Sequence, residues 1–540
     1  MASSVFARDE RDHHVETPID EASSFGDDAN NVWSRRATSA LVAIGCAGTT
    51  MIVLAGIING PRGTHSAIER DVIALVPSGV AGGVCSTVLL IAGLIAVFGA
   101  WLVLGLRLRR GAPLNPLRRL AVIWGVPLAL GPPIFSRDVY SYAALGKMVN
   151  THLDPYQVGP ATLGASHFVS PVGSAWLYTR SPYGPLFIGF ASRVVQHSGD
   201  SVLRAAMMLR VVEIAALACI AIALPRLAVA AGKDPARALW LGVCNPLILL
   251  HFVGGAHNDA LMVALIVAGL ALAVAKRPLA AVLLCVVAAT IKAPAILAAV
   301  FIIAEAVRAM PQGRRLLGLA RLTGAGAAAF TLITWATGMG WGWVGAMMVP
   351  GENHLLLTPT TALAQVVSDF VGHDAAVLAA SRGLGYLVAG VGIGYLLWRA
   401  PVIGTTRACG LAFALVVAFG PIVLPWYALW AVVILAAAGR RIERGYAILL
   451  SVALSIVVWP SGAAMPDILL VAVLISLSAV ALAIVWRHAR QWIRHGLAVA
   501  IDEYRSRGQL AHLSDIARRA LQDGWRQART RVEPVPSDYA

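Results

Sequence analysis

The sequence predicts an all-α polytopic membrane protein. Of its 540 residues, 58% are hydrophobic and only 13% are charged, whereas a soluble globular chain carries about 25% charged residues. Apolar runs rich in Leu, Ala, Val, Ile and Gly recur along the chain, and most are near the ~20 residues that a spanning helix needs. They lack the alternating pattern of an outer-membrane barrel. A helical bundle in a bilayer is therefore the expected fold.

Three parts of the chain differ in composition. Residues 1–36 are acidic and polar, and we expect them to form a disordered cytoplasmic arm. Residues 37–486 contain the apolar runs and are the expected membrane domain, with no cleavable signal ahead of them. Residues 487–540 alternate arginines with apolar residues, which is typical of one or two basic amphipathic helices on an anionic cytoplasmic leaflet.

About 13 to 14 spans are expected within the membrane domain. The candidate runs are residues 37–59, 79–106, 118–135, 203–225, 236–253, 257–275, 278–291, 293–307, 318–337, 382–398, 408–424, 426–438, 445–459 and 466–486. The stretch 186–195 is too short to span and is expected to dip into the membrane or lie along it. The runs on either side of Lys292 and of Pro425 are also short, so we expect hairpins whose turns stop within the membrane.

The basic residues predict the orientation of the chain. The net charge is +15, and Lys and Arg gather at every second connection between spans, which places those connections in the cytoplasm. Both termini are then cytoplasmic, and the long polar connection 136–202 forms a large first external loop. This pattern of charge indicates contact with membrane lipids and gives no support to a nucleic-acid partner.

Motifs for metals and nucleotides do not occur in the sequence. The six cysteines lie inside apolar runs without paired spacing, so neither a disulfide framework nor a metal cluster is indicated. The chain has no P-loop, no glycine-rich nucleotide motif, no HExxH and no Asp-x-Asp in its external connections. We therefore expect no metal and no cofactor.

Asp138 is the first candidate for a catalytic residue. It follows the apolar run 118–135 and begins the longest polar interval in the chain. An acid at the edge of the hydrocarbon is costly and usually has a function. The alternative is that Asp138 caps a helix that starts at Val139, and one residue can do both.

Further polar groups are predicted to lie on the same external side. They are His251, His257, Asn258, Asp259, Lys292, Trp426 and Tyr427. Lys292 and Trp426 are expected to face a lateral cavity that is open to lipid and to the outer solvent. There Lys292, together with Arg137 or Arg180, could hold the phosphate of a lipid-carried donor. The alternative is a lysine that snorkels near a helix end.

Acid–base chemistry and aromatic stacking fit a glycosyl transfer. Asp138 could take the proton of an attacking hydroxyl while an oxocarbenium-like centre develops on the donor sugar. Five aromatic side chains could stack on sugar rings or isoprene units: Tyr140, Tyr142, Tyr183, Trp426 and Tyr427. Anchoring at the membrane interface is the alternative for each of them.

Six motifs, in this order along the chain, carry a resemblance to a known family. They are Phe-Ser-Arg-Asp-Val-Tyr-Ser-Tyr (135–142), Leu-Asp-Pro-Tyr-x-Val-Gly-Pro (153–160), Pro-Tyr-Gly-Pro-Leu-Phe (182–187), Asn-Pro-Leu (245–247) with Gly-x-His-Asn-Asp (255–259), Ile-Lys-Ala-Pro (291–294) and Leu-Pro-Trp-Tyr-x-x-Trp (424–430). Together they closely resemble the α-(1→6)-mannopyranosyltransferases of mycobacteria and corynebacteria. The resemblance covers roughly residues 37–486.

This resemblance implies a GT-C glycosyltransferase bundle in the plasma membrane. Such an enzyme transfers mannose from polyprenyl-phosphate mannose to a lipid-linked mannan acceptor on the external face, by an inverting mechanism. In the family an acid near the start of the first large external loop is the base, and Asp138 matches that position better than Asp154. The sequence departs from the family at Asp259, where His257 and Asn258 are commonly followed by Glu.

Two alternatives belong to other classes of function. A transporter or a flippase for lipid-linked sugars would also combine broken helices with charged residues in the membrane. It requires polar groups that are accessible from both sides, whereas here they gather on one side. A protein O-mannosyltransferase would share the fold class and the donor, and would differ in using a peptide acceptor.

Overall fold

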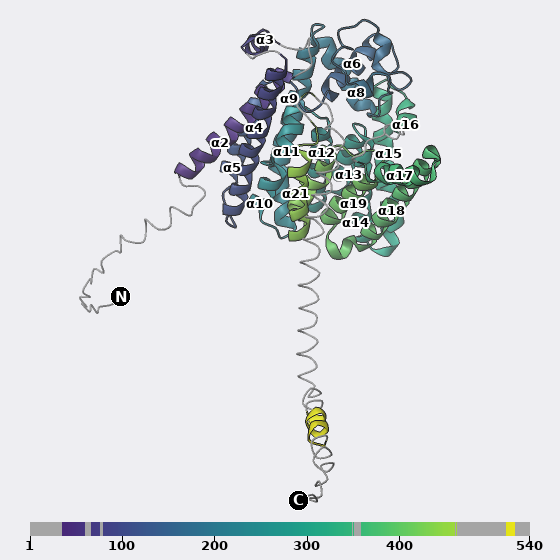
Figure 1. Ribbon diagram of the computed structural model, residues 1–540. Helices are drawn as coiled ribbons and strands as arrows, with labels where there is room; N and C mark the ends of the chain where they lie inside the picture. Colours follow the sequence, from purple (N-terminus) through teal and green to yellow (C-terminus); the bar gives the residue numbers. More distant parts are fainter. Residues whose placement is uncertain are drawn as a thin grey trace, which may run out of the picture. The chain divides into compact units, whose positions relative to one another are not determined.

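The computed structural model describes residues 35–59, 66–75, 79–347, 349, 358–458, 461 and 515–523. The chain separates into two units, Met1–Leu470 and Val471–Ala540. In the described part of the first unit the regular elements are all helices (Figure 1), which confirms the predicted fold class. In the second unit, residues 515–523 are helical. Residues 1–34 of the expected arm, the expected span 466–486 and most of the expected basic tail lie outside the described residues.

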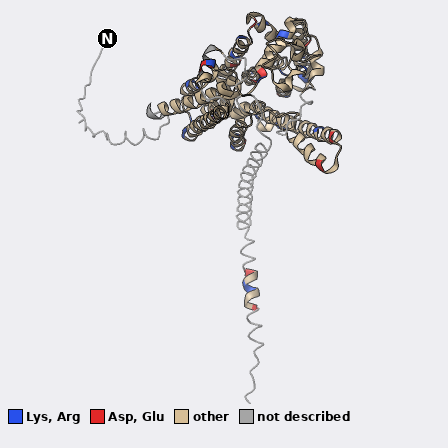
Figure 2. Cartoon of the chain, turned by 45° about the horizontal axis from the view of Figure 1, so that its top comes forward, with Lys and Arg blue, Asp and Glu red and all other residues tan. Residues whose placement is uncertain are grey.

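Every expected span from 37–59 to 445–459 coincides with a helix or a bent pair of helices. The membrane helices are α2 (Arg35–Asn59), α4 (Val80–Arg107), α5 (Leu114–Leu130), α9 (Val202–Ala230), α10 (Pro235–Gly242), α11 (Pro246–Ile248) with the π-helix η4 (Leu249–Gly254), α12 (Asp259–Val274), α13 (Pro278–Ala289), α14 (Ile296–Arg308), α15 (Arg315–Ala336), α18 (Asp374–Ile403), α19 (Thr405–Phe419), α20 (Ala428–Ala438) and α21 (Arg441–Leu454). Figure 2 shows that most of these helices carry few charged residues.

Not all of these helices are long enough to cross a bilayer alone. By length and composition, five helices of the described residues can do so, or six if the bent pair α10 and α11–η4 counts as one span. Four others, α12, α13, α19 and α20, are apolar but shorter. The number of about 13 to 14 spans is therefore not reached by full-length helices.

Prolines account for several of the breaks. The run 236–253, expected as one span, is interrupted at Asn245 and bends by 46°. Pro246 has no amide hydrogen and cannot continue the helix, and the Asn245 side chain caps the new helix by accepting from the Leu247 N–H at 3.0 Å. The turn at Lys292 and Pro294 likewise separates α13 from α14, with a short 3-10 helix, η5 (Ala293–Ala295), between them.

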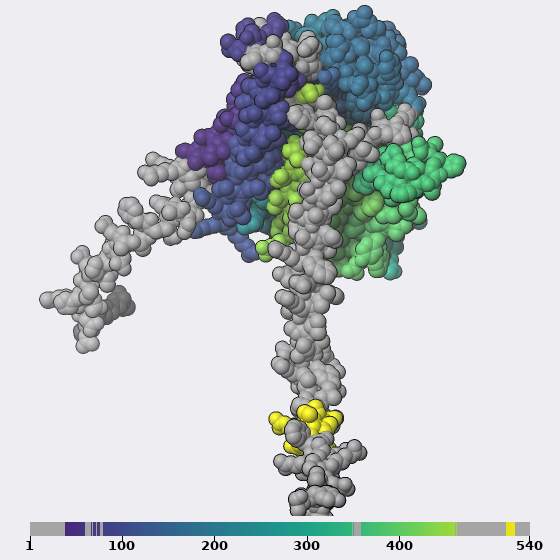
Figure 3. Space-filling model, viewed as in Figure 1, coloured from purple at the N-terminus to yellow at the C-terminus, as the bar shows by residue number. Residues whose placement is uncertain are grey.

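The expected first external loop folds into a compact helical segment, which is called the external segment below. It consists of α6 (Asp138–Asn150), η3 (Pro160–Leu163), α7 (Ser174–Leu177) and α8 (Pro185–His197), and Figures 1 and 3 show it gathered at one end of the first unit. Helices α6 and α8 pack closely at Gly146, where an added Cβ would lie 2.6 Å from the Ala191 carbonyl oxygen. Buried aromatic residues of both helices, among them Tyr142 and Phe187, form its core.

The external segment is joined to the Lys292 turn through backbone groups. The N–H of Gly184 donates to Ile291 O at 2.9 Å, and the N–H of Leu186 donates to Thr290 O at 3.0 Å. These bonds fix the start of α8 on the turn between α13 and α14. A residue of the external segment can therefore reach groups that lie at the ends of the membrane helices.

Candidate active site

Asp138 is buried in the first turn of α6 and is held by two side chains. Only 4% of the residue is exposed. Its Oδ1 accepts a hydrogen bond of 3.0 Å from Trp176 Nε1 of α7, and its Oδ2 lies 3.4 Å from His257 Nδ1. The alternative that Asp138 caps α6 is not what the structure shows, because Arg137 occupies the N-cap position without a side-chain bond.

His257 is buried between Asp138 and Trp426. Its ring stacks on that of Trp426, with centroids 3.8 Å apart and an angle of 21° between the planes. Neither of its ring nitrogens makes a hydrogen bond of good geometry to a described residue, so its approach to Asp138 is an electrostatic contact. Trp426, expected beside Lys292, therefore packs behind the histidine.

Asn258 and Asp259 extend the polar group into the bundle. Asn258 Oδ1 accepts from the Tyr142 hydroxyl at 3.3 Å. Asp259 is fully buried, and its Oδ1 accepts from Lys292 Nζ at 2.8 Å and from Trp430 Nε1 at 2.6 Å. Residues 138, 257, 258 and 259 thus come together from the first turn of α6, the turn ahead of α12 and the first residue of α12.

Lys292 combines an ion pair with aromatic surroundings. Besides its bond to Asp259, Nζ lies 4.3 Å from the centroid of the Tyr427 ring, 5.3 Å from that of Trp430 and 5.7 Å from that of Tyr183. Rings at such distances attract a cation through their electron-rich faces. The ammonium is thus held in place and is not extended toward solvent as a snorkelling lysine would be.

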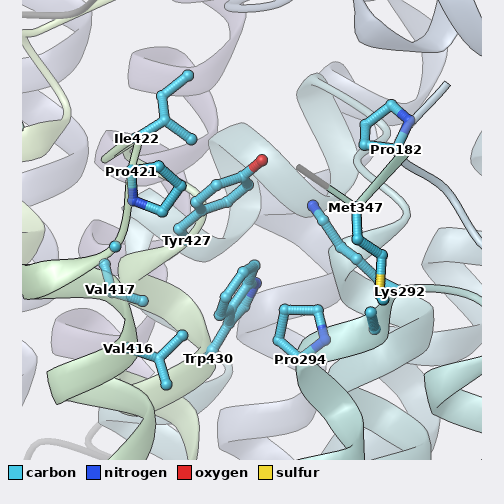
Figure 4. Close-up of a pocket in the computed structure, with 12 residues that line it drawn as sticks. Pro182, Lys292, Pro294, Met347, Val416, Val417, Pro421, Ile422, Tyr427 and Trp430 are labelled. Atoms are coloured by element: carbon cyan, nitrogen blue, oxygen red, sulfur yellow. The ribbon is translucent and has the colours of Figure 1, made fainter. Parts of the chain in front are cut away.

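A cavity of about 350 Å³ opens beside this lysine. Its walls are largely apolar and come from the Lys292 turn, the end of α19 and the start of α20; in Figure 4 the Lys292 amine and the ring of Tyr427 border it. The lining residues are Pro182, Lys292, Ala293, Pro294, Met347, Val416, Val417, Gly420, Pro421, Ile422, Tyr427 and Trp430. The cavity predicted from the short runs is therefore present at Lys292, although Trp426 does not line it.

The remaining predicted site residues are more dispersed. Tyr140 is fully buried in the core of the external segment. Arg137 donates from Nε to Ser461 O at 3.2 Å, and Arg180 is half-buried. Neither arginine lines the cavity.

Tyr142 and Tyr183 are neutral donors near the carboxylates. Burial raises the pKa of each hydroxyl well above the ordinary value for tyrosine, and the charge of Asp138 raises both pKa values further. The two rings meet edge to face, with centroids 5.0 Å apart. At neutral pH both therefore keep their proton and can donate to an oxygen.

Four residues at or near the site were not predicted: Trp176, Trp430, Arg210 and Glu213. Glu213 of α9 accepts from the N–H of Leu261, in the first turn of α12, at 2.9 Å. The signal for Glu213 and Arg210 was present, since a charged residue within an apolar span is rarely without a function. No group of three or more potential metal ligands occurs within the described ranges.

The comparisons with known proteins identify a family. Residues 42–308 match the model of the α-(1→6)-mannopyranosyltransferase N-terminal domain, and residues 356–487 match that of the MptB C-terminal domain. No solved structure gives a significant match.

Two curated relatives span most of the chain. The α-(1→6)-mannopyranosyltransferase A of Mycobacterium tuberculosis is 34% identical over 402 residues, which cover 72% of this chain and 78% of the relative. The protein of the same name from Corynebacterium glutamicum is 31% identical over 413 residues, which cover 69% and 82%. Both alignments exceed 30% identity and cover more than two thirds of the relative, so this chain belongs to the α-(1→6)-mannopyranosyltransferase family.

Proposed function

We propose that this protein is a membrane mannosyltransferase that transfers mannose from polyprenyl-phosphate mannose to a lipid-linked mannan acceptor and forms α-(1→6) linkages. The sugar and the linkage follow from the names of its relatives. The distribution of basic connections supports a plasma-membrane enzyme with its site on the external face and both termini in the cytoplasm.

The observation that carries the mechanism is the buried Asp138 carboxylate, held by Trp176 and faced by His257. The 6-hydroxyl oxygen of the acceptor attacks the anomeric carbon of the donor and gives its proton to Asp138. The bond between that carbon and the phosphate oxygen breaks, and polyprenyl phosphate leaves with the electron pair. A single displacement inverts the anomeric centre, so an α-linked product requires a β-linked donor.

Lys292 and its cavity are suited to the donor. The Lys292 ammonium has three N–H groups, and one of them donates a hydrogen bond to Asp259. The others can bind the phosphate while the apolar cavity walls accept the first isoprene units. Arg137 and Arg180, on the external segment, are further candidates for the phosphate.

The aromatic and amide groups are suited to the sugars. Tyr183 can donate to a hydroxyl oxygen, Tyr142 can accept through its own hydroxyl oxygen, and Tyr427 and Trp430 line the cavity. His257 and Asn258 lie between the base and the Asp259–Lys292 pair. No step in this scheme uses a metal or a cofactor.

The test is the substitution Asp138→Asn, which keeps the shape of the side chain and removes the base. Transfer to a mannoside acceptor should fall by about 10² to 10⁴, while the amount of protein in the membrane stays normal. Asp154→Asn is the matched control, because an asparagine oxygen can still accept from the Tyr156 N–H as Asp154 does at 2.8 Å. Near-normal turnover by Asp138→Asn would remove this residue from the mechanism. A transporter or flippase would lengthen no acceptor in the same assay.

A further inference from the structure

Arg210 is a buried cation within a membrane helix. It lies in α9, which is long and apolar enough to span, and only 1% of the residue is exposed. No carboxylate of the described residues lies within ion-pair distance of its guanidinium. A charged side chain at such a position is costly unless its contacts serve a purpose.

Besides a contact of Nη1 with Met207 Sδ of the same helix at 3.3 Å, its hydrogen bonds go to backbone carbonyls of two other elements. Nη1 donates to Ala129 O at 3.1 Å and to Gly131 O, at the C-terminal end of α5. Nη2 donates to Gly254 O at 3.0 Å, at the end of η4. The last carbonyls of a helix have no partner within it and attract a cation, so one guanidinium satisfies two helix ends together.

These two ends lead directly into the candidate site. Seven residues after Gly131 the chain reaches Asp138, and three residues after Gly254 it reaches His257. The two segments are also joined by the bond from Ile134 N–H to Gly254 O at 3.1 Å. The relative position of Asp138 and His257 therefore depends on how these helix ends are fastened.

Both segments contain a residue in an unfavourable backbone conformation. Phe135 has φ 66° and Ala256 has φ 51°, the left-handed region that residues with a Cβ avoid. Such conformations persist only where the surrounding contacts impose them, and they cluster at functional sites. The Arg210 guanidinium supplies contacts of this kind, because it forms hydrogen bonds to backbone carbonyls at the start of both segments.

We propose that Arg210 is a positioning residue that fastens the end of α5 to the end of η4 and thereby sets Asp138 against His257. The inference rests on the proposed function, since it takes Asp138 as the base. Arg210 itself does not touch the reacting atoms. Its contribution is to hold the base in the geometry that transfer requires.

The experiment compares Arg210→Lys with Arg226→Lys. A lysine keeps the charge but has a single nitrogen, which cannot reach both helix ends. Displacement of a catalytic group by about 1 Å can cost 10²-fold in rate, so kcat should fall by about 10²-fold while both KM values stay within about twofold. Arg226 lies on the same helix and donates to Ile222 O of that helix at 3.1 Å, so Arg226→Lys should leave kcat unchanged.

A second pair of variants separates positioning from general support of the fold. Arg210→Lys and His257→Gln disrupt the same arrangement, so the double variant should be no slower than the slower single variant. Multiplied effects, or an unchanged kcat in Arg210→Lys, would overturn the inference. Arg210→Gln, which is neutral, replaces the lysine variant if that protein does not accumulate. If neither variant accumulates in the membrane, Arg210 serves folding and the positioning role is rejected.

Asp138→Asn is measured in parallel. If it stays active, the proposed base fails whatever Arg210 does. If it is inactive while the Arg210 variants keep normal turnover, only the positioning role fails.

Discussion

The hydrogen bond from Trp176 to the Asp138 carboxylate can be tested by substitution. Trp176→Phe removes the indole N–H and keeps an aromatic ring. A hydrogen bond to a charged group contributes about 1.5–3 kcal/mol, so we expect kcat to fall by about 10- to 100-fold with an unchanged KM for the donor. Trp335→Phe is the matched control, because Trp335 is 79% exposed. Equal turnover of the two variants would show that the bond to Asp138 is dispensable.

Substitutions in the Lys292–Asp259 ion pair can separate its effect on protein stability from its effect on donor binding. Lys292→Met leaves a buried carboxylate without its cation, at a cost of about 3–5 kcal/mol, so we expect less protein in the membrane. The double variant Lys292→Met with Asp259→Asn removes both charges and should restore the amount of protein. It should not restore use of the donor, whose KM should stay raised by at least about tenfold while that of the acceptor changes little.

Lys292→Arg completes this comparison. It keeps the charge in a planar fork and should retain part of the activity. The measurement is the apparent KM for donor and acceptor in each variant. Equal small effects on both substrates would assign the phosphate to Arg137 and Arg180 instead.

At the scale of elements, the contact between the external segment and the Lys292 turn can be tested at Gly184. A Cβ at this position would lie 2.3 Å from Thr290 O, a backbone atom that cannot rotate away. Gly184→Ala should therefore displace the start of α8 from the turn and lower kcat by about 10-fold or more. Gly189→Ala, whose Cβ would meet Thr337 at an ordinary 3.5 Å, is the control. Transfer assays on equal amounts of the two proteins decide the matter, and equal rates would mean that the contact does not position the site.

The positions of the apolar helices could be predicted from the sequence more reliably than the residues at which they end or break. Hydropathy located each span in the described residues because burial in a membrane requires long apolar runs. The break at Asn245 was missed, since the apolar pattern continues across it and the Asn–Pro pair alone does not indicate whether a helix bends or ends. The short runs beside Lys292 did predict a cavity, because a turn at that depth requires a cavity around it.

For the whole molecule, the orientation is the prediction that matters most. Cysteines introduced by Tyr178→Cys, in the external segment, and by Gly313→Cys, between α14 and α15, should differ in their access to an impermeant maleimide. We expect labelling of the first in intact cells and of the second only after permeabilisation, because basic connections stay in the cytoplasm. The unsubstituted chain is the control for its own cysteines. The reverse pattern would place the site on the cytoplasmic side.

The candidate site could be predicted as a set of residues but not as a set of contacts. Loop charge alone predicted that Asp138, His257, Asp259 and Lys292 lie on one side of the membrane. Which groups meet depends on packing between segments that are far apart in sequence: Trp176 reaches Asp138 across 38 residues and Trp430 reaches Asp259 across 171. Such contacts are set by the tertiary fold and cannot be predicted from the order of polar and apolar residues along the chain.

The fixed ammonium of Lys292 has a consequence for the end of the reaction. Under the proposed function, the phosphate of the donor is a diester with one negative charge, whereas the spent carrier is a monoester with a charge of about −1.5 to −2 at pH 7. A cation held between Asp259 and aromatic rings therefore attracts the spent carrier more strongly than the loaded one. Under the proposed function, we therefore expect spent carrier to compete with the loaded donor for this site.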